Sequence, residues 1–242
     1  MKIAVLTLAV GETFKQKVYY AHKSKIEYCL RHGYDFIEDE TVVDTSRPIA
    51  WSKILLMQKY LDSYDYVVWM DADAMVTNMN SKLEEKIPLM NGRPMMVASV
   101  CGMINTGVWF VRSCFESMEM LMEIFLQKDF IDHGNWEQEA FIHLLEGKRY
   151  FSEEVEVVLG KSKELQTYLR EYSHGDFIVH MAGMRGDNLA WTLRKVFERL
   201  YPLRREDETE DQYVARKHWL RDNVAEAIRG FYLKSPYELI ER

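Results

Sequence analysis

The sequence has little of what marks several common classes of protein. Its 242 residues include only 3 cysteines, 5 prolines and 12 glycines. This scarcity excludes a disulfide-rich, collagen-like or low-complexity chain. Hydrophobic residues make up 48% of the chain and charged residues 29%, so a packed core is expected rather than disorder. The length fits one α/β domain, or one such domain with a helical appendage.

Positive charge is also in deficit. The 31 Lys and Arg residues are outnumbered by 38 Asp and Glu residues, which gives a formal net charge of −7. Proteins that bind nucleic acids in bulk usually present a basic surface, and electrostatic docking on anionic lipid needs one too. We therefore expect neither nucleic acid nor an anionic membrane surface as a partner.

Neither cysteine chemistry nor a membrane segment is indicated. Cys29, Cys101 and Cys114 match no zinc-binding spacing, so we expect three reduced thiols in a cytosolic or similar compartment. The most apolar N-terminal stretch, residues 3–10, is far shorter than the ~18–20 residues that span a bilayer. It also has no basic leader or small-residue cleavage site, which favours a buried first strand over a signal peptide.

Hydrophobic patterning predicts alternating strands and helices over the first 70 residues. The predicted elements are a strand at 3–8, a helix at 13–32, a strand at 34–37, a helix at 51–61 and a strand at 64–70. This order is typical of a parallel sheet with helices on its faces. Ligands of such sheets bind beyond the carboxyl ends of the strands, which is where Asp71 and Asp73 follow the third strand.

The rest of the chain continues in the same style and ends in a charged helical tail. We predict strands at 95–100, 107–111, 155–159 and 177–180, and helices at 115–127 and 137–145. In the tail, Thr209 and Gln212 form a predicted capping box. An apolar stripe follows at Tyr213, Leu220, Val224, Ala227, Ile228 and Phe231. We expect a catalytic domain over residues 1–190 and a helical extension over 191–242 that packs on it, with packing on a second copy as the alternative.

Asp71 and Asp73 are the first candidates for chemistry. Two carboxylates directly after a buried strand repel each other unless something neutralises them. A hard divalent cation held together with a phosphate would do so. The alternative is a solvated turn in which the Asp side chains bind local backbone amides.

Further candidates lie before and after this pair. Lys53 and Arg185 could contact phosphate, although a lone helical lysine is usually solvated. His180 follows a predicted strand, and histidine is a common metal ligand, but a histidine there is also an ordinary polar group. Gly183 would let the backbone approach a ligand closely.

The order of these motifs resembles that of a known enzyme family. The motifs are Trp51-Ser52-Lys53, Trp69-Met70-Asp71-Ala72-Asp73-Ala74, Asn105-Thr106-Gly107, Glu137-Gln138-Glu139-Ala140 and His180-Met181-Ala182-Gly183-Met184-Arg185. Together they resemble the GT-A glycosyltransferases, and within these the galactosyl/xylosyl/mannosyl transferase family of yeast and plants (GMA12/MNN10 type). The resemblance covers roughly residues 1–190. It implies a Rossmann-like α/β GT-A fold with a C-terminal helical extension.

The resemblance also implies an activity and a set of site residues. The enzyme would move a hexose or pentose from a nucleotide sugar to a glycan or another hydroxyl acceptor. Mn²⁺, with Mg²⁺ as the alternative, would be held by Asp71, Asp73 and His180. The nucleotide sugar, a UDP-sugar by analogy with most relatives, would contact Thr7, Ala9, Lys53, Asp71, Ala72, Asn105, Thr106, Gly183 and Arg185. The catalytic residues would be Gln138, Glu137 and Asp73.

Gln138 would face the anomeric carbon, which becomes oxocarbenium-like during glycosyl transfer. An amide is a poor nucleophile, so no covalent intermediate on Gln138 is expected. The resemblance alone implies retention of configuration, by front-face attack. Arg185 stands where family members carry a lysine, which keeps the charge but replaces a point charge with a planar fork.

Golgi members of the family carry an N-terminal membrane anchor, whereas this sequence begins with its first strand. We therefore expect a soluble cytoplasmic enzyme of a bacterium or virus.

Three other functions stay open. A haloacid dehalogenase-like phosphohydrolase also places Asp-x-Asp after a buried strand, but Met75 stands where that class has a hydroxyl or β-branched residue. A sugar-nucleotide pyrophosphorylase would need a Gly-rich loop after the first strand, where Gly11 stands alone. A non-catalytic nucleotide-sugar-binding module would bind the donor without turnover.

Overall fold

The computed structural model describes residues 1–203, 205 and 207–223. Its strands form a six-stranded sheet in the order β2-β1-β3-β6-β5-β7 and a three-stranded sheet in the order β4-β9-β8. The strands are β1 (Ile3–Thr7), β2 (Asp35–Glu38), β3 (Tyr66–Met70), β4 (Ala74–Val76), β5 (Met95–Val100), β6 (Met103–Arg112), β7 (Val155–Val158), β8 (Thr167–Tyr168) and β9 (Ile178–His180). The α-helices are α1 (Glu12–His32), α2 (Ser52–Leu61), α3 (Phe115–Phe125), α4 (Trp136–Gly147), α5 (Arg149–Glu154), α6 (Gly186–Leu200) and α7 (Glu210–Asp222).

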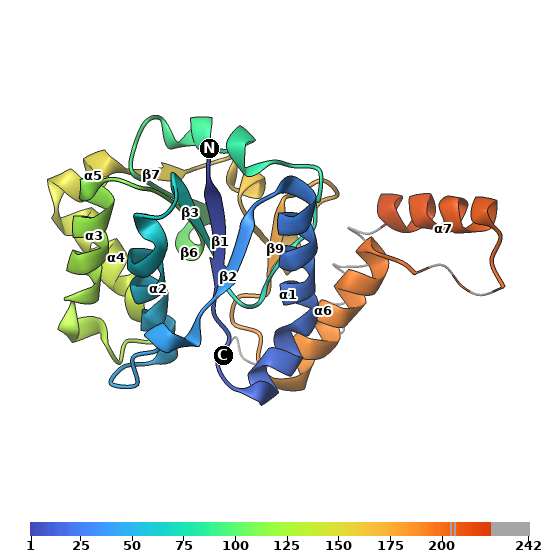
Figure 1. Ribbon diagram of the computed structural model, residues 1–242, viewed down its shortest axis with the longest axis horizontal. Coiled ribbons are helices and arrows are strands. Elements are labelled where there is room, and N and C mark those ends of the chain that lie inside the picture. Colours follow the sequence, from blue (N-terminus) through green and yellow to red (C-terminus); the bar gives the residue numbers. More distant parts are fainter. Residues whose placement is uncertain (204, 206, 224–242) are drawn as a thin grey trace.

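The large sheet lies between two layers of helices. Helices α2, α3, α4 and α5 lie on one side of it, and α1 and α6 lie together on the other (Figure 1). All five residues of β1 are buried, as expected for a central strand that is covered on both faces. This explains why the first strand has continuous rather than alternating hydrophobicity.

The parallel sheet predicted from the first three strands is confirmed. Strand β1 pairs in parallel with both β2 and β3. Beyond β3 the direction changes, because β6 runs antiparallel to β3 and to β5. Strands β5 and β6 are joined by a two-residue turn at Cys101 and Gly102, which both have positive φ, at 53° and 80°. So short a connection permits only an antiparallel pair.

The small sheet was not predicted, and it brings two distant parts of the chain together. Strand β4 begins immediately after the Asp-x-Asp pair and runs antiparallel to β9, with Ala74 opposite His180. The amide of Met181 also donates a hydrogen bond to the carbonyl of Asp73 at 3.3 Å. A three-residue strand with no alternation of its own thus places His180 beside the two carboxylates, more than 100 residues along the chain from them.

The C-terminal part begins with α6, which packs against α1. The predicted capping box is confirmed: the Thr209 amide donates to Gln212 Oε1 at 2.9 Å, and the Gln212 amide donates to Thr209 Oγ1 at 3.3 Å. The predicted stripe from Val224 onward lies outside the described residues. The division at 190/191 falls within α6 and stays a prediction.

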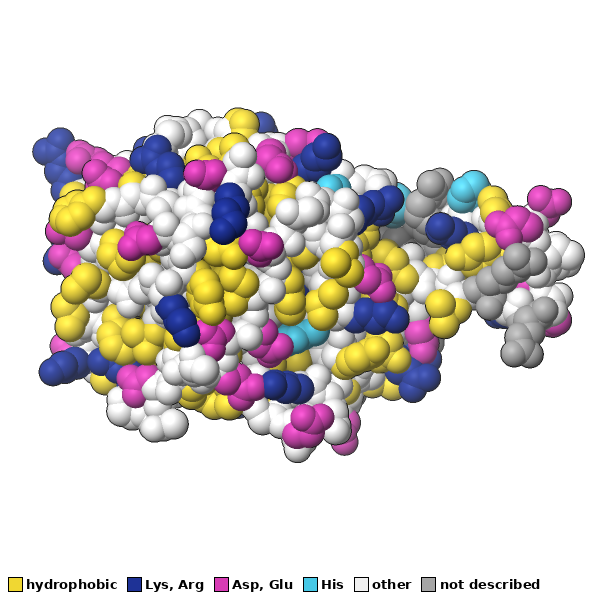
Figure 2. All heavy atoms as spheres, viewed as in Figure 1, with side chains coloured by type: hydrophobic (Ala, Val, Ile, Leu, Met, Phe, Trp, Pro, Cys, Tyr) yellow, Lys and Arg dark blue, Asp and Glu magenta, His cyan; other side chains and the backbone are white. Residues whose placement is uncertain are grey.

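The surface mixes charges of both signs. On the face shown in Figure 2, Lys and Arg side chains are interspersed with Asp and Glu side chains and with apolar ones. No helix within the described ranges has both the length and the apolar character needed to cross a bilayer.

Candidate metal centre and active-site cleft

Asp71, Asp73 and His180 converge on one point. Each offers one ligand atom, and these atoms lie within 4.8 Å of one another. His180 Nε2 is 3.2 Å from Asp73 Oδ1 and 3.5 Å from Asp71 Oδ2. Two carboxylates with one imidazole are a donor set that suits Mn²⁺ or another divalent cation. The three residues that the sequence nominated as metal ligands therefore form one cluster.

The neighbours of Asp71 hold it in place. Its amide donates to the carbonyl of Gly107 at 2.7 Å. Its Oδ1 accepts hydrogen bonds from Trp69 Nε1 at 2.6 Å and from Lys53 Nζ at 3.1 Å. Burial alone would raise the pKa of Asp71. The nearby charges of Lys53 and His180 lower it by more than burial raises it, so the pKa lies below its ordinary value. Asp71 is thus an ionised, oriented carboxylate whose Oδ2 faces His180.

Lys53 serves the carboxylates rather than open solvent. The residue is only 4% exposed, and its ammonium lies 2.7 Å from Glu137 Oε1 and 3.1 Å from Asp71 Oδ1. Lysine was nominated as a phosphate contact, and it does line the cleft described below. In this structure, however, its ion pairs connect Asp71, which follows β3, to Glu137 at the start of α4.

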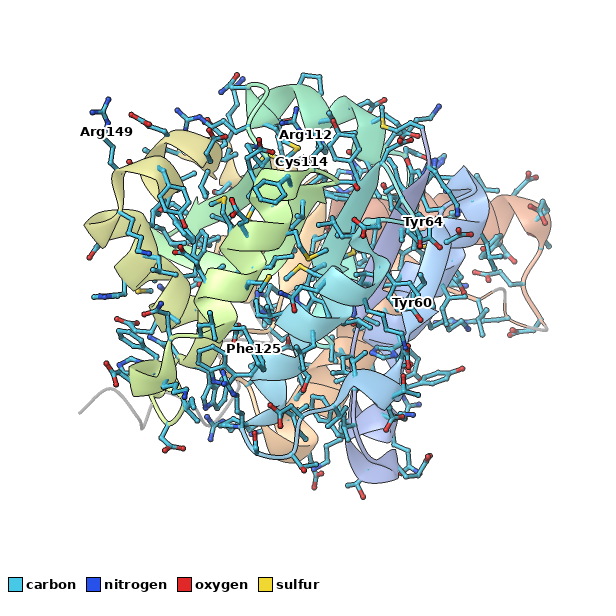
Figure 3. All side chains as sticks on the ribbon, turned by 60° about the vertical axis from the view of Figure 1, so that its left-hand side comes forward. Tyr60, Tyr64, Arg112, Cys114, Phe125 and Arg149 are labelled. Carbon is cyan, nitrogen blue, oxygen red and sulfur yellow. The ribbon has the colours of Figure 1, made fainter. Side chains whose placement is uncertain are left out.

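Trp51, in the same motif, is a core residue that sets the position of Lys53. Its side chain is fully buried, and its Nε1 donates to the carbonyl of Ile131 at 3.2 Å. Its ring meets that of Phe125 edge-on, with 6.3 Å between the centroids. Figure 3 shows Phe125 at the end of α3, on the side of the sheet where α2 lies.

The pKa of His180 reflects opposing effects. Burial lowers it, while the charge and hydrogen bond of Asp73 and the charge of Asp71 raise it, and the net pKa lies above the ordinary value of 6.5. A proton or a metal ion on Nε2 relieves the same crowding of negative charge. The site is therefore built to hold a positive charge at this position.

Lys25 belongs to the site and was missed by the sequence analysis. It is completely buried on α1. Its ammonium donates to the carbonyls of Asp71 at 2.7 Å and Ala72 at 3.1 Å, and to Thr7 Oγ1 at 3.3 Å. Burial lowers its pKa to about 7, against the opposing charges of Asp73 and Asp71. Lys25 therefore anchors the backbone of the Asp-x-Asp turn from behind.

A signal for Lys25 was present in the sequence. The buried residues of α1 are Val18, Ala21, Ser24, Lys25, Tyr28 and Cys29. Lys25 stands four residues after Ala21 and three before Tyr28, on the buried stripe of the helix. A lysine within an apolar stripe needs buried acceptors, and such acceptors exist at the end of the neighbouring strand.

The Asn105-Thr106-Gly107 segment packs directly on the metal ligands. The Gly107 amide donates to Asn105 Oδ1 at 2.9 Å. A Cβ atom at Gly107 would lie 2.1 Å from Cε1 of His180 and 2.5 Å from its Nδ1. Glycine is therefore required here by the close approach of the imidazole. The Thr106 amide donates to Gln138 Oε1 at 3.1 Å, which ties the segment to α4.

The cluster lies in a cleft of about 610 Å³, a size typical of small-molecule sites. Its lining includes eleven of the thirteen nominated site residues: Lys53, Asp71, Ala72, Asp73, Asn105, Thr106, Glu137, Gln138, His180, Gly183 and Arg185. Apolar walls are added by Leu8, Val10, Phe14, Pro48, Ile49, Ala50, Trp69 and Trp136. Residues that are far apart in the sequence are thus collected around one cavity.

Thr7 and Ala9 are placed differently from the other nominated residues. Both are fully buried and are absent from the described lining of the cleft, where Leu8 and Val10 stand instead. The Ala9 amide already donates to Glu38 Oε1 at 3.1 Å. Their contact with a nucleoside stays a prediction. At this edge of the sheet, Leu8 and Val10 provide the wall of the cleft.

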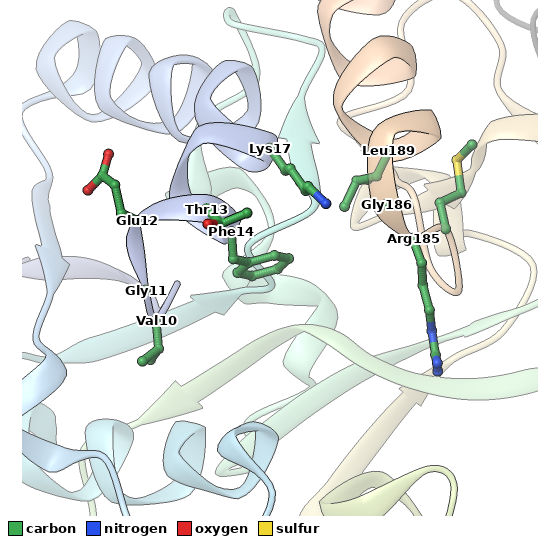
Figure 4. A pocket seen from close by; sticks show the side chains of 10 residues that line it. Val10, Gly11, Glu12, Thr13, Phe14, Lys17, Arg185, Gly186 and Leu189 are labelled. Atoms are coloured by element: carbon green, nitrogen blue, oxygen red, sulfur yellow. The ribbon is translucent and has the colours of Figure 1, made fainter.

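A second cavity of about 430 Å³ adjoins the first between the starts of α1 and α6. The two share Val10, Phe14 and Arg185. Figure 4 shows Lys17 reaching from α1 toward Leu189 on α6, while Arg185 extends away from them. Arg185 therefore lines both cavities from the start of α6.

Comparison with known proteins supports the resemblance. Residues 2–93 match the galactosyl transferase GMA12/MNN10 family. A probable glycosyltransferase 3 of Oryza sativa subsp. indica is 30% identical over 123 residues, 47% of this chain and 26% of that protein. Xyloglucan 6-xylosyltransferase 1 of Arabidopsis thaliana is 31% identical over 109 residues, 41% of this chain and 24% of that protein. The match thus spans about a quarter of the length of these relatives.

The fold also has a solved counterpart. The crystal structure of a glycosyltransferase involved in the glycosylation of the major capsid of PBCV-1 superposes with a TM-score of 0.66. The two chains are 18% identical, and the superposition covers 81% of this chain and 100% of that one. The predicted GT-A fold is confirmed.

Proposed function

We propose that the chain catalyses metal-dependent transfer of a hexose or pentose from a nucleotide sugar to a hydroxyl of a glycan or another acceptor. The observation that carries this proposal is the convergence of Asp71, Asp73 and His180 at the edge of the large cleft. The family match over residues 2–93 and the relatives named as glycosyltransferases support the reaction class. A UDP-sugar is the favoured donor.

The three ligands suit Mn²⁺, with Mg²⁺ as the alternative. When bound, such an ion neutralises charge that develops on the departing nucleoside diphosphate. The residues behind the ligands keep them in register: Lys53 orients Asp71 from one side, and Lys25 holds the carbonyls of Asp71 and Ala72 from the other. The ammonium of Lys53 adds positive charge beside the two carboxylates. Lys25, whose pKa is lowered to about 7, adds positive charge only when it is protonated.

Gly183 and Arg185 would receive the diphosphate in this proposal. Gly183 lines the cleft with a φ of 80°, a backbone conformation that side chains disfavour, so the main chain is open to a ligand. Helix α6 begins at Gly186 with no side-chain cap. Its first amides and its dipole favour an anion nearby. The Arg185 guanidinium would add a planar pair of donors.

Glu137 and Gln138, at the start of α4, would contact the transferred sugar. Gln138 Oε1 accepts from the Thr106 amide, which fixes the direction of its amide group. A carbonyl oxygen held in this way can face an electron-deficient anomeric carbon but cannot serve as a covalent nucleophile. On the family resemblance alone we propose retention by front-face attack of the acceptor hydroxyl, with Gln138 as an electrostatic stabiliser.

The proposal is tested by incubating the protein with a panel of UDP- and GDP-sugars and measuring nucleoside diphosphate release with and without Mn²⁺. Release is expected for at least one donor and only with a divalent cation. Asp73→Ala and His180→Ala should each lower the rate of nucleoside diphosphate release by more than ~10–100-fold, which is the loss typical when a partner of a metal ligand is removed. The exposed Asp62 and His174 provide matched controls as Asp62→Ala and His174→Ala.

Two outcomes would reject the proposal. One is release that does not depend on metal and is unchanged in both ligand variants. The other is hydrolysis of a phosphate monoester with no activity on any nucleotide sugar, which is the result expected of a phosphohydrolase. Binding of a donor without turnover would favour a non-catalytic module instead.

A further inference from the structure

Gln166 joins the candidate metal centre to the central sheet. It lies immediately before β8 and is completely buried. Its Nε2 donates to the carbonyl of Asn105 at 3.0 Å, and its Oε1 lies 2.9 Å from Nδ1 of His180. The sequence did not identify Gln166 as a candidate site residue, because its segment has no strong hydrophobic periodicity and no motif.

These two contacts determine which ring nitrogen of His180 carries the proton. The carbonyl of Asn105 can only accept a hydrogen bond, so it faces the NH₂ group of Gln166. The amide oxygen of Gln166 therefore faces His180, and an oxygen can only accept from Nδ1. In the neutral ring the proton consequently lies on Nδ1, and Nε2 carries an unshared electron pair.

That electron pair points at negative charge. Nε2 lies 3.2 Å from Asp73 Oδ1 and 3.5 Å from Asp71 Oδ2. Three acceptors that face one another repel unless a cation lies between them. We infer that Gln166 is a positioning residue which holds His180 in the Nδ1–H tautomer and so reserves Nε2 for a divalent cation. The inference rests on the proposed metal-dependent function.

The first test measures Mn²⁺ affinity by electron paramagnetic resonance, with no donor or acceptor present. Gln166→Met has a similar length but neither hydrogen-bonding group, and its Kd should rise by ~10–100-fold, as is typical of outer-shell losses. Gln166→Glu keeps an acceptor for Nδ1–H, and its carboxyl group in the protonated form can still donate to the Asn105 carbonyl. Acidic side chains commonly orient metal-bound histidines, so its Kd should stay near the wild-type value. Gln16→Met, at an exposed position on α1, is the matched control.

The second test reads the tautomer directly in the metal-free wild-type protein. With ¹⁵N-labelled histidine, two-dimensional NMR above the pKa of the ring should show the His180 proton on Nδ1. In Gln166→Met the proton should shift toward Nε2, where Asp73 can accept it. Should Gln166→Met fail to fold, the wild-type spectrum and the Kd of Gln166→Glu still decide the question.

The results separate this inference from the proposed function. A wild-type protein that binds no Mn²⁺ overturns the metal site itself. A wild-type protein that binds Mn²⁺ but carries its proton on Nε2, or a folded Gln166→Met variant that binds Mn²⁺ as well as wild type, overturns the role of Gln166 alone. A Gln166→Glu variant as weak as Gln166→Met would show that the acceptor is not what matters, which also overturns that role.

Discussion

The close contact between Gly107 and His180 gives the most specific prediction from the structure. Replacing Gly107 with Ala adds one methyl group at a position where a Cβ atom would lie 2.1 Å from His180 Cε1, 2.5 Å from His180 Nδ1 and 2.7 Å from Asn105 Oδ1. All three contacts are too short to persist. The imidazole cannot step aside freely, since it is 3% exposed and bonded to Gln166.

The size of the effect follows from these distances. To restore an ordinary contact of 3.4 Å, the ring or the strand must retreat by about 1.3 Å. Overpacking of this kind costs about 1–3 kcal/mol of unfolding free energy. Distances between a metal ion and its ligands vary by only about 0.2 Å, so a shift of this size does not fit the coordination. Gly107→Ala should therefore weaken Mn²⁺ binding much more than it destabilises the fold.

Chemical denaturation and Mn²⁺ titration of the same preparations would measure both effects. Gly147→Ala is the matched control, because a Cβ atom there meets nothing within 4 Å and the residue does not have a positive φ. We expect Gly147→Ala to behave as wild type. If Gly107→Ala matches it in both stability and Mn²⁺ affinity, the packing of His180 against β6 is wrong.

Three further predictions concern buried and exposed ionisable groups. Lys25→Met should lower the free energy of unfolding by about 1–3 kcal/mol in urea denaturation, because the buried carbonyls of Asp71 and Ala72 lose their donor. An unchanged denaturation midpoint would contradict this. The raised pKa of His180 means that, without metal, its proton stabilises the fold below the ordinary pKa of 6.5 and that this contribution is lost as pH rises through the raised value. Mn²⁺ affinity should have the opposite dependence and fall as pH drops through that value, so a pH-independent Kd would argue against His180 as a ligand. Burial raises the pKa of Cys29 to about 12. In native protein at mildly alkaline pH, iodoacetamide should therefore label the exposed Cys101 but not Cys29, as read by mass spectrometry. Equal labelling of the two thiols would contradict the burial of Cys29.

Much of the fold could be predicted because burial leaves a pattern in the sequence. Strand β1 is fully buried and β3 is buried from Val67 onward, and both appear as continuous apolar runs. Helix α1 is capped at its C-terminus by Gly33, whose φ of 74° few other residues adopt. The small sheet could not be predicted in the same way. Strands β4 and β8 have three and two residues, too few for a period to show, and they are defined by pairing with β9.

The site residues also fall into those that the sequence could identify and those that it could not. Asp71 and Asp73 were found because charge interrupts an apolar strand, and His180 because the order of motifs resembles a family. Lys25 and Gln166 were not found. The position of Lys25 on the apolar stripe of α1 predicts its burial. Which carbonyls Lys25 and Gln166 contact depends on tertiary pairing, which no local pattern shows.

The most direct test of the central claim is diffraction from crystals grown with Mn²⁺ and UDP, recorded near the manganese absorption edge. The account predicts one strong anomalous peak bounded by Asp71, Asp73 and His180 Nε2, with the diphosphate of UDP against it and near Gly183. A peak elsewhere, or UDP bound with no manganese at these three residues, would contradict it.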